Sequence, residues 1–279
     1  MLIINPISPV AFSILGFDIR WYALAYIAAF VVGYWVMRWL VKSARAENFP
    51  PLQTKKSFDD LLTYIIIGTI AGGRLGYVLF YNLSYFIEHP LEIFAIWHGG
   101  MAFHGGLIGV LVAVFLFARR GAYSRPGRKY APLQNGFAIL DLLAIVAPIG
   151  IFFGRIANFI NMEVMGRTTD GPLGIVFAGA TDQTPRHASP LYEAALEGIV
   201  LFLIMFTLWR FTRMRERIGA LSGIFAISYA VLRIFAEQFR EPDAHIGFLT
   251  SWGLTMGQLL SAGMIAAGTF ILIWSFRRK

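Results

Sequence analysis

Apolar residues occur along this chain in seven long blocks that are separated by shorter polar connections. Each block is close to the ~20 residues that an α-helix needs to cross about 30 Å of hydrocarbon. The pattern therefore predicts an all-α polytopic membrane protein with seven transmembrane helices. The predicted spans are residues 21–41, 58–81, 91–118, 136–154, 191–209, 219–239 and 255–276. Because they follow one another almost without interruption, we expect a single membrane domain over residues 1–279.

The overall composition supports the same class of protein. Hydrophobic residues make up 57% of the chain and charged residues only 14%, which is well below the charged fraction of soluble domains. The first twenty residues carry no basic segment ahead of an apolar one, so they do not have the pattern of a cleaved signal peptide. We expect them to form a short external segment that lies against the membrane interface.

The basic residues predict the orientation of the spans. Seventeen of the 24 lysines and arginines lie in four clusters. The clusters are Arg38, Lys42, Arg45, Lys55 and Lys56; Arg119, Arg120, Arg125, Arg128 and Lys129; Arg210, Arg213, Arg215 and Arg217; and Arg277, Arg278 and Lys279. Loops rich in such residues stay cytoplasmic. The first, third and fifth connections and the C-terminus are therefore predicted to be inside, and the N-terminus outside.

The outer connections show the complementary pattern. Residues 82–90, 155–190 and 240–254 contain no lysine. The longest of them, 155–190, has three prolines and a predicted short strand or turn at residues 173–177. Connections of this length inside a compact domain are commonly functional. We expect this one to form a small external cap after the fourth span.

The other seven basic residues are all arginines, and they lie within the apolar spans or at their outer ends. They are Arg20, Arg74, Arg155, Arg167, Arg186, Arg233 and Arg240. A charge at the centre of the bilayer costs about 2.5 to 3.5 kcal/mol on insertion scales, so such residues usually face an interior cavity. Because a guanidinium donates paired hydrogen bonds and stays charged, several of them favour a phosphate ligand such as a phospholipid head group.

Several other polar residues lie inside the spans, and each has a structural alternative to a catalytic role. His104 lies among glycines in the third span and could simply pack there. Glu193 and Glu197, which share a helix face at i, i+4, and Asp141 are better explained as groups that pair helices than as catalysts. Arg233 could likewise be neutralised by Glu237, four residues later, while Arg20 beside Trp21 and Tyr22 suits an interfacial anchor.

Other kinds of chemistry find little support. The chain has no cysteine, so it offers no disulfide, thiolate metal site or thiol nucleophile. Its histidines lack metal-ligand spacing, and we predict no metal and no cofactor. The cytoplasmic clusters are explained by topology and by attraction to anionic lipid, and we expect no nucleic-acid partner. Composition by itself leaves an enzyme and an anion or lipid transporter open.

One segment, residues 154–167, favours the enzyme. Here the fourth span runs directly into two arginines, two asparagines and a glutamate, in the sequence GRIANFINMEVMGR. This signature segment resembles the signature of the prolipoprotein diacylglyceryl transferases. Further resemblance lies in RWY at 20–22, GGRLGY at 72–77, GGMAFHGG at 99–106, RHASPLYE at 186–193 and the stretch 233–243. Three positions depart from the family pattern: Ala157 and Met162, where many members carry glycine, and Ala188, where a proline is common.

The resemblance implies an enzyme of the bacterial inner (cytoplasmic) membrane. Its donor is phosphatidylglycerol, and its acceptor is the lipobox cysteine thiol of prolipoprotein signal peptides. The diacylglyceryl group moves to sulfur as a thioether, and glycerol phosphate leaves. A substrate thiol as the nucleophile agrees with an enzyme that has no cysteine of its own.

The conserved chemistry of that reaction suggests a role for each site residue. As catalytic residues we expect Arg155 and Arg233, which would hold the phosphate, and His104, the candidate base for the thiol. As substrate-binding residues we expect Tyr22, Tyr26, Arg74, Asn158, Glu163, Glu237 and Arg240. Among these, Glu237 is expected to fix Arg233, and Arg240 to guard the outer mouth. A lipid-binding scaffold is a third possible reading of the same residues.

Overall fold

The computed structural model of the chain describes residues 2–4, 7–43, 52, 55–119, 132–177, 183–242, 247–251 and 253–277. Much of the first and third predicted cytoplasmic connections, including Arg45 and Arg125, lies outside these residues. The chain divides into two compact units, and each is described here by itself. The first unit contains residues 1–39 and 141–279, and the second contains residues 40–140. The single domain expected from the sequence stays a prediction.

Apolar helices make up most of the fold, as predicted. Among the described residues, five helical segments are long and apolar enough to cross a membrane: α1 (Trp21–Lys42), α2 (Lys55–Phe80), α5 (Pro132–Ile160), the run Ser189–Phe211 and α9 (Met256–Arg277). Two further apolar helices, α4 (Phe103–Arg119) and α8 (Ala220–Ala236), have 17 residues each. The protein is therefore a mostly helical, multi-pass membrane protein, and the coarse prediction of fold class is confirmed.

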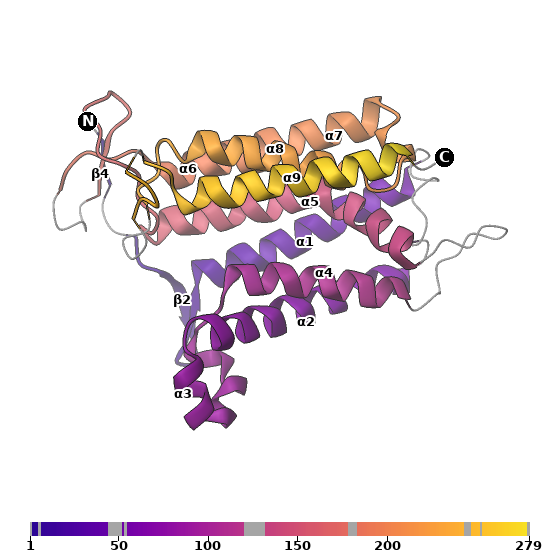
Figure 1. Cartoon of the computed structure of the whole chain (residues 1–279). Helices are drawn as coiled ribbons and strands as arrows, with labels where there is room; N and C mark the ends of the chain where they lie inside the picture. Colours follow the sequence, from indigo (N-terminus) through magenta and orange to yellow (C-terminus); the bar gives the residue numbers. More distant parts are fainter. Residues whose placement is uncertain are drawn as a thin grey trace. The chain divides into compact units, whose positions relative to one another are not determined.

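Within the first unit, α8 packs along α9, and α7 contacts α8 on its other side (Figure 1). The run Ser189–Phe211 has three parts: α6 (Ser189–Glu193), the π-helical η4 (Ala194–Val200) and α7 (Leu201–Phe211). A short 3₁₀ turn, η5 (Met214–Glu216), connects α7 to α8. A π-helical turn inside an α-helix is rare and is frequently found at a functional site.

Asp141 connects two helices of the first unit, in agreement with its interpretation as a group that pairs helices. It lies on α5, and its carboxylate accepts hydrogen bonds from the main-chain N–H groups of Gly219 and Ser222 at 2.6 and 2.7 Å. The Ser222 hydroxyl donates a third bond at 2.7 Å. These N–H groups open α8 and have no partner within the helix, so Asp141 satisfies them and caps α8 from a neighbouring helix.

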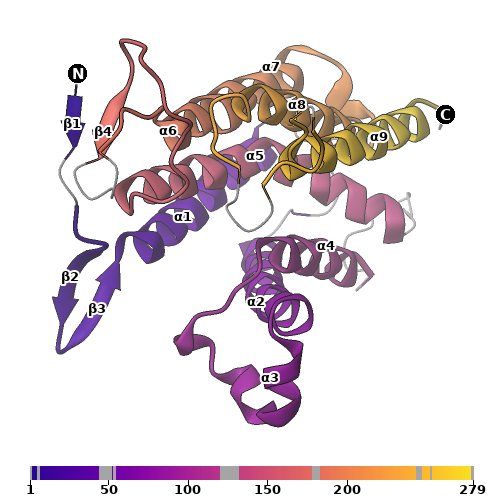
Figure 2. The same ribbon diagram turned by 60° about the vertical axis from the view of Figure 1, so that its left-hand side comes forward.

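Two small sheets accompany the helices, so the all-α expectation is incomplete. Strand β4 (Ile175–Phe177), at the predicted position, pairs in parallel with β1 (Leu2–Ile4). Strands β2 (Val10–Ile14) and β3 (Phe17–Arg20) form an antiparallel hairpin that leads directly into α1 (Figure 2). The sequence reading missed the three N-terminal strands because each has only three to five residues, and in β3 the alternation of apolar and polar residues covers just four positions.

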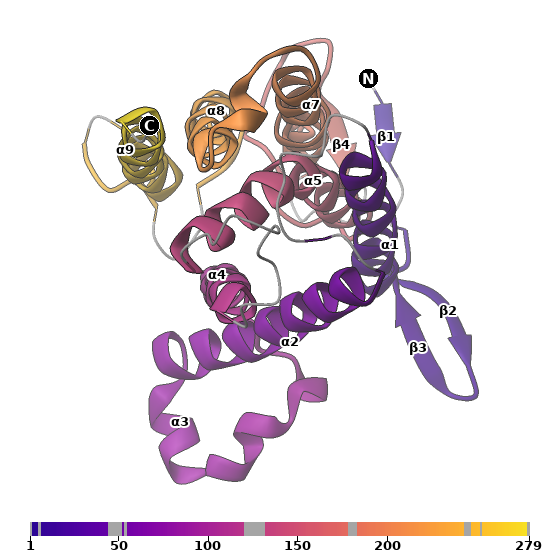
Figure 3. The same ribbon diagram turned by 90° about the vertical axis from the view of Figure 1, so that its right-hand side faces the viewer.

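The second unit is built on a close contact between α2 and α4 (Figure 3). Glycines line both helices at this contact. A Cβ atom added to Gly105 of α4 would lie 2.3 Å from the carbonyl oxygen of Gly72 on α2. Small residues of this kind let the backbones of membrane helices approach closely. The glycine-dense stretch therefore packs α4 onto α2, as the sequence suggested.

The third predicted span differs from the structure. Helix α4 begins only at Phe103, whereas the span was expected from residue 91. Ahead of it lie α3 (Leu83–Glu88) and two 3₁₀ turns, η2 (Pro90–Phe94) and η3 (Ile96–His98). Gly99 and Gly100 follow with φ values of +83° and +76°, which a right-handed helix cannot contain. The apolar run is long enough to span, but these two glycines divide it.

Candidate active site

The first half of the signature segment is helical. Helix α5 continues to Ile160, beyond the predicted end at residue 154. Arg155 and Asn158 therefore lie three residues apart on one face of the same helix. Arg155 has only 20% of its side chain exposed, and Asn158 is buried. The helix thus places a cation and an amide together near its end.

Two buried carboxylates hold Arg155. The Nε atom of Arg155 lies 2.8 Å from Glu193 Oε2, and its Nη2 atom lies 3.1 Å from Glu197 Oε2. Glu193 ends α6 and Glu197 lies in the π-helical turn η4, and neither side chain is exposed. The expectation that these glutamates pair helices agrees with these contacts, because they join the Ser189–Phe211 run to α5.

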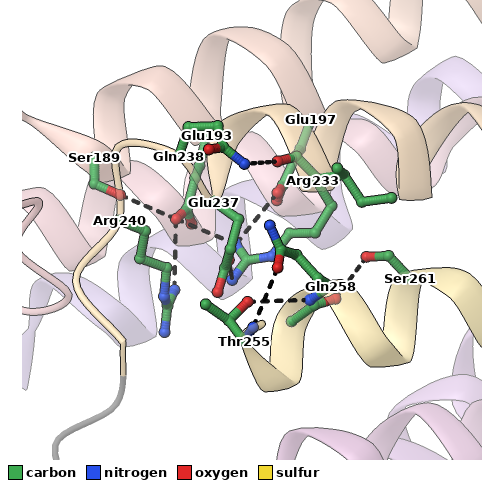
Figure 4. Close-up of polar contacts among 12 residues, drawn as sticks. Ser189, Glu193, Glu197, Arg233, Glu237, Gln238, Arg240, Thr255, Gln258 and Ser261 are labelled. Atoms are coloured by element: carbon green, nitrogen blue, oxygen red, sulfur yellow. Dashed lines mark hydrogen bonds and ion pairs between the residues drawn. The ribbon is translucent and has the colours of Figure 1, made fainter. Parts of the chain in front are cut away.

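Arg233 of α8 reaches the same two carboxylates from another side. Its Nη1 atom lies 3.2 Å from Glu193 Oε1 and 3.4 Å from Glu197 Oε1, and its Nη2 atom lies 2.7 Å from Glu237 Oε2. Arg240 adds a longer contact of 3.5 Å to Glu193 Oε1. Figure 4 shows Arg233 and Arg240 converging with these glutamates.

These six side chains form what we call the arginine–carboxylate network: Arg155, Arg233, Arg240, Glu193, Glu197 and Glu237. Its formal charges balance, three positive against three negative. Burying an ionised carboxylate has a penalty of several kcal/mol, which several close cations and hydrogen bonds can offset. Glu193 has such support on both oxygens, including a bond from the Ser189 hydroxyl at 3.1 Å. The network is therefore a cluster with no formal net charge and with many hydrogen-bond donors.

A second polar cluster lies where α5 ends. The Asn158 side-chain amide donates to the hydroxyl of Tyr22 on α1 and, at 3.2 Å, to Glu163 Oε2. Asn161 donates to the other carboxylate oxygen of Glu163 at 3.4 Å. The Tyr26 ring stacks on Tyr22 with 6.2 Å between ring centres. Four of the expected substrate-binding residues therefore lie together.

The backbone of the signature segment is unusual after this cluster. Met162 and Val164 have φ values of +55° and +58°, in the left-handed region that disfavours residues with a side chain. A glycine at position 162 would adopt this conformation without strain. Backbone strain of this kind concentrates at functional sites, where the surrounding structure holds it in place.

Arg74 and His104 belong to the second unit, and each is described by its own contacts there. His104 is the second residue of α4, and its ring packs edge-on against Phe103. Arg74 is buried on α2 and donates to main-chain carbonyl groups of the chain between α2 and α4. These contacts differ from the phosphate-facing role that the sequence suggested for Arg74.

Sequence reasoning did not select Tyr229 as a site residue. It lies on α8, four residues before Arg233, and within electrostatic range of Glu197, Arg155 and Arg233. The i, i+4 spacing to Arg233 was the available signal. It was easy to overlook because tyrosine is common in apolar helices, whereas a buried arginine or glutamate stands out.

Comparison with known proteins identifies the family. The sequence matches the profile of the prolipoprotein diacylglyceryl transferase family over residues 9–274. The chain belongs to this family. A phosphatidylglycerol–prolipoprotein diacylglyceryl transferase of Rhodospirillum rubrum is 49% identical over 274 residues, covering 98% of this chain and 94% of the relative. The enzyme of the same name from Azospirillum brasilense is 49% identical over 273 residues, with 98% and 96% covered.

Membership of the prolipoprotein diacylglyceryl transferase family confirms the resemblance drawn from the signature segment. The match extends over nearly the full length of both chains, so it includes both units and both polar clusters. The arginine–carboxylate network and the Tyr22–Asn158–Glu163 cluster both lie in the first unit.

Proposed function

We propose that this chain transfers the diacylglyceryl group of phosphatidylglycerol to the lipobox cysteine thiol of prolipoproteins. The relatives named above carry this donor and acceptor in their names. The observation that supports the proposal most directly is the geometry of the Arg155 guanidinium. Its Nε and Nη2 atoms are held by glutamates, while no residue that the structure describes bonds to its Nη1 atom. A fixed guanidinium with a spare edge is suited to a phosphate.

The reaction needs a bond exchange at carbon. The cysteine sulfur forms a bond to the terminal glyceryl carbon, the bond from that carbon to the phosphate oxygen breaks, and glycerol phosphate leaves. The thiol proton passes to a base. Arg155 and Arg233 stabilise the charge that develops on the departing phosphate, which is the kind of interaction that lowers such barriers most.

Glu237 keeps the fork of Arg233 in one orientation, and Arg240 extends the positive edge toward the outer side. Tyr22, Tyr26, Asn158 and Glu163 orient the glycerol head group through hydroxyl, amide and carboxylate hydrogen bonds. The contacts of Asn158 with Tyr22 and Glu163 support this assignment, because they hold three of these groups against one another.

His104 is the proposed base for the acceptor thiol, since an imidazole accepts a proton near neutral pH. His104→Gln should then lose most activity at neutral pH and regain part of it at higher pH, where more of the substrate thiol is ionised without help. Initial rates with a lipobox peptide between pH 6 and 9 test this. A profile parallel to that of the unmodified enzyme would assign His104 a positioning role.

The proposal includes a place and an orientation: seven spans in the bacterial inner membrane, with the N-terminus and the cap outside and the C-terminus inside. The predicted basic clusters and the lysine-free outer connections support it. The chain has no cysteine, so single substitutions can report sidedness. A membrane-impermeant maleimide should label Asp170→Cys in spheroplasts and label Arg213→Cys only after permeabilisation. The reverse pattern would invert the topology.

The function is tested with purified protein in phosphatidylglycerol vesicles and a lipobox peptide. We expect the peptide to gain one diacylglyceryl group for each glycerol phosphate released, and a peptide with serine in place of cysteine to give neither product. If folded protein produces neither with the cysteine peptide, the transferase proposal fails. Anion flux across the same vesicles would then test the transporter.

A further inference from the structure

Arg74 binds the main chain of its own unit at four points. Its Nε atom donates to the carbonyl oxygen of Ile93 at 2.8 Å, and its Nη2 atom donates to that of Glu92 at 2.6 Å. Its Nη1 atom donates to the carbonyl oxygens of Gly99 and Gly100 at 2.5 and 3.2 Å. One buried side chain thus connects both ends of the segment 92–100.

These contacts occupy most of what an arginine can offer. The guanidinium has five N–H donors, and the four carbonyl groups take four of them. The Phe86 ring, 5.0 Å from the guanidinium carbon, covers it further. Arg74 is only 6% exposed. One N–H of Arg74 remains, so a paired approach of a lipid phosphate to the guanidinium edge would have to displace carbonyl groups that already accept hydrogen bonds from it.

The backbone of the segment is shaped for this contact. Gly99 and Gly100 have positive φ values, and their carbonyl oxygens both reach Nη1 of Arg74. A Cβ atom at Gly100 would lie 2.5 Å from the Tyr77 ring and 3.0 Å from Nη1 of Arg74. A side chain at this position would therefore separate the segment from Arg74.

The segment leads directly to His104. The N–H of Ala102 donates to the carbonyl oxygen of Gly73, the residue before Arg74, at 2.9 Å. Phe103 then begins α4, and the close packing of Gly105 against Gly72 follows within the first turn. His104 therefore lies between two fixed points on α2: the Arg74 contacts before it and the glycine contact after it. Figure 3 shows α2, α3 and α4 of this unit.

We infer that Arg74 is a positioning residue, which holds the segment 92–102 on α2 and thereby fixes the start of α4 and the His104 side chain. The catalytic consequence rests on the proposed role of His104. Lysine cannot replace Arg74, because a single ammonium group cannot reach carbonyls that lie along three sides of a planar fork. The inference gives Arg74 a task that is different from binding the lipid.

The test compares Arg74→Lys with the unmodified protein, as full-length chains in phosphatidylglycerol nanodiscs. Hydrogen exchange is followed by mass spectrometry in peptides that cover residues 92–108. We expect exchange at least tenfold faster in Arg74→Lys, kcat about a hundredfold lower because the base is misplaced, and KM for phosphatidylglycerol within twofold. Arg119→Lys, at the exposed end of α4, is the matched control and should match the unmodified protein.

Gly100→Ala is a second variant that should detach the segment 92–102 from α2. It disturbs the contact between the segment and Arg74 while keeping the Arg74 side chain. It should give the same faster exchange. Unchanged exchange in both variants would overturn the inference, and so would a raised KM with unchanged exchange, which would indicate direct lipid contact. If His104→Gln instead retains full activity, the proposed base fails, while the exchange result still decides whether Arg74 holds the segment.

Discussion

The buried arginines of the two units are held by different partners. In the first unit, Arg155 and Arg233 are held by carboxylates that neutralise their charge. In the second unit, Arg74 is held by main-chain carbonyl groups, whose dipoles satisfy its hydrogen bonds but supply no opposite charge. An arginine bound to carbonyls is committed to the local fold, whereas a charge-balanced network can take up an additional anion through its spare donors. In our proposal, the nature of the acceptor, rather than burial, separates an arginine that holds the fold from one that binds the phosphate.

Asp141 is the corresponding case of a buried negative charge. It is a buried carboxylate whose partners are the N–H groups and hydroxyl at the start of α8. Like Arg74, it is held by local groups of the fold and has no described ion pair. Variants of Arg155 should therefore fail in catalysis, whereas variants of Asp141 should fail in stability.

The largest effect is expected for Arg155→Ala, which removes the guanidinium with the spare edge. Transferase activity should fall about 10³-fold, equivalent to about 4 kcal/mol in the barrier, because the departing phosphate loses its fixed donors. Steady-state rates in phosphatidylglycerol vesicles measure this. Arg155→Lys keeps a positive charge near the glutamates and guards against misfolding, and it should also lose most activity. Arg213→Ala, at an exposed position, is the control that should keep full activity.

The next largest effect is expected on stability, from a change in the arginine–carboxylate network. Glu193→Gln removes the carboxylate that contacts three arginines, and it leaves buried positive charge without compensation. We expect a loss of about 3 kcal/mol in stability. Thermal unfolding in detergent, with Glu241→Gln as the matched variant, provides the measurement. Glu241 pairs with Arg186 but is 51% exposed, so its loss should change stability by less than about 1 kcal/mol. Equal effects would contradict the importance of the buried network.

A smaller effect is expected for Asp141→Asn. The amide keeps one acceptor for the start of α8 but presents N–H groups toward another donor, so the cap is only half satisfied. Stability should fall by about 1 to 2 kcal/mol, with kcat and KM near those of the unmodified enzyme. Unfolding curves and kinetics on the same preparation separate the two quantities. A selective loss of kcat at full stability would move Asp141 into the catalytic group.

The smallest effect is expected from a variant that tests whether Glu237 holds Arg233 in place. A Cβ atom at Gly257, in the first turn of α9, would lie 2.7 to 2.8 Å from the carboxylate atoms of Glu237. Gly257→Ala should therefore displace Glu237 from Arg233 and lower kcat about tenfold. At Gly263, on the same helix, a Cβ atom meets nothing within 4 Å. Gly263→Ala should keep kcat and gain up to about 1 kcal/mol in stability from helix propensity. Similar kinetics in the two variants would argue against the contact.

The sequence was sufficient for some parts of this picture. The lengths of the apolar blocks predicted the long helices. The i, i+4 spacing of Arg233 and Glu237 predicted an ion pair that the structure contains. The signature segment gave the family. In each case the information is local, since neighbouring residues on a helix or within one motif determine the outcome.

Other parts depend on contacts that no local pattern encodes. Glu193 reaches Arg155, Arg233 and Arg240 across three helices, and the choice of partner follows from packing. The partners of Arg74 are carbonyl groups, which every residue possesses, so sequence could not distinguish them from a phosphate. The third span was predicted too long for a similar reason. The positive φ angles of Gly99 and Gly100 interrupt the helix, and their carbonyl oxygens accept hydrogen bonds from Arg74, which no local pattern indicates.

The parallel pairing of β1 with β4 has a consequence for the order in which the protein is made. Leu2 pairs with Ile175, so strand β1 must wait for its partner until the long stretch of chain between them has been synthesised. At typical synthesis rates this interval is on the order of ten seconds or more. During that time the β1 edge has no partner, and several apolar helices enter the membrane first. The pair can form only if both strands reach the same side of the bilayer, which requires an even number of spans between them.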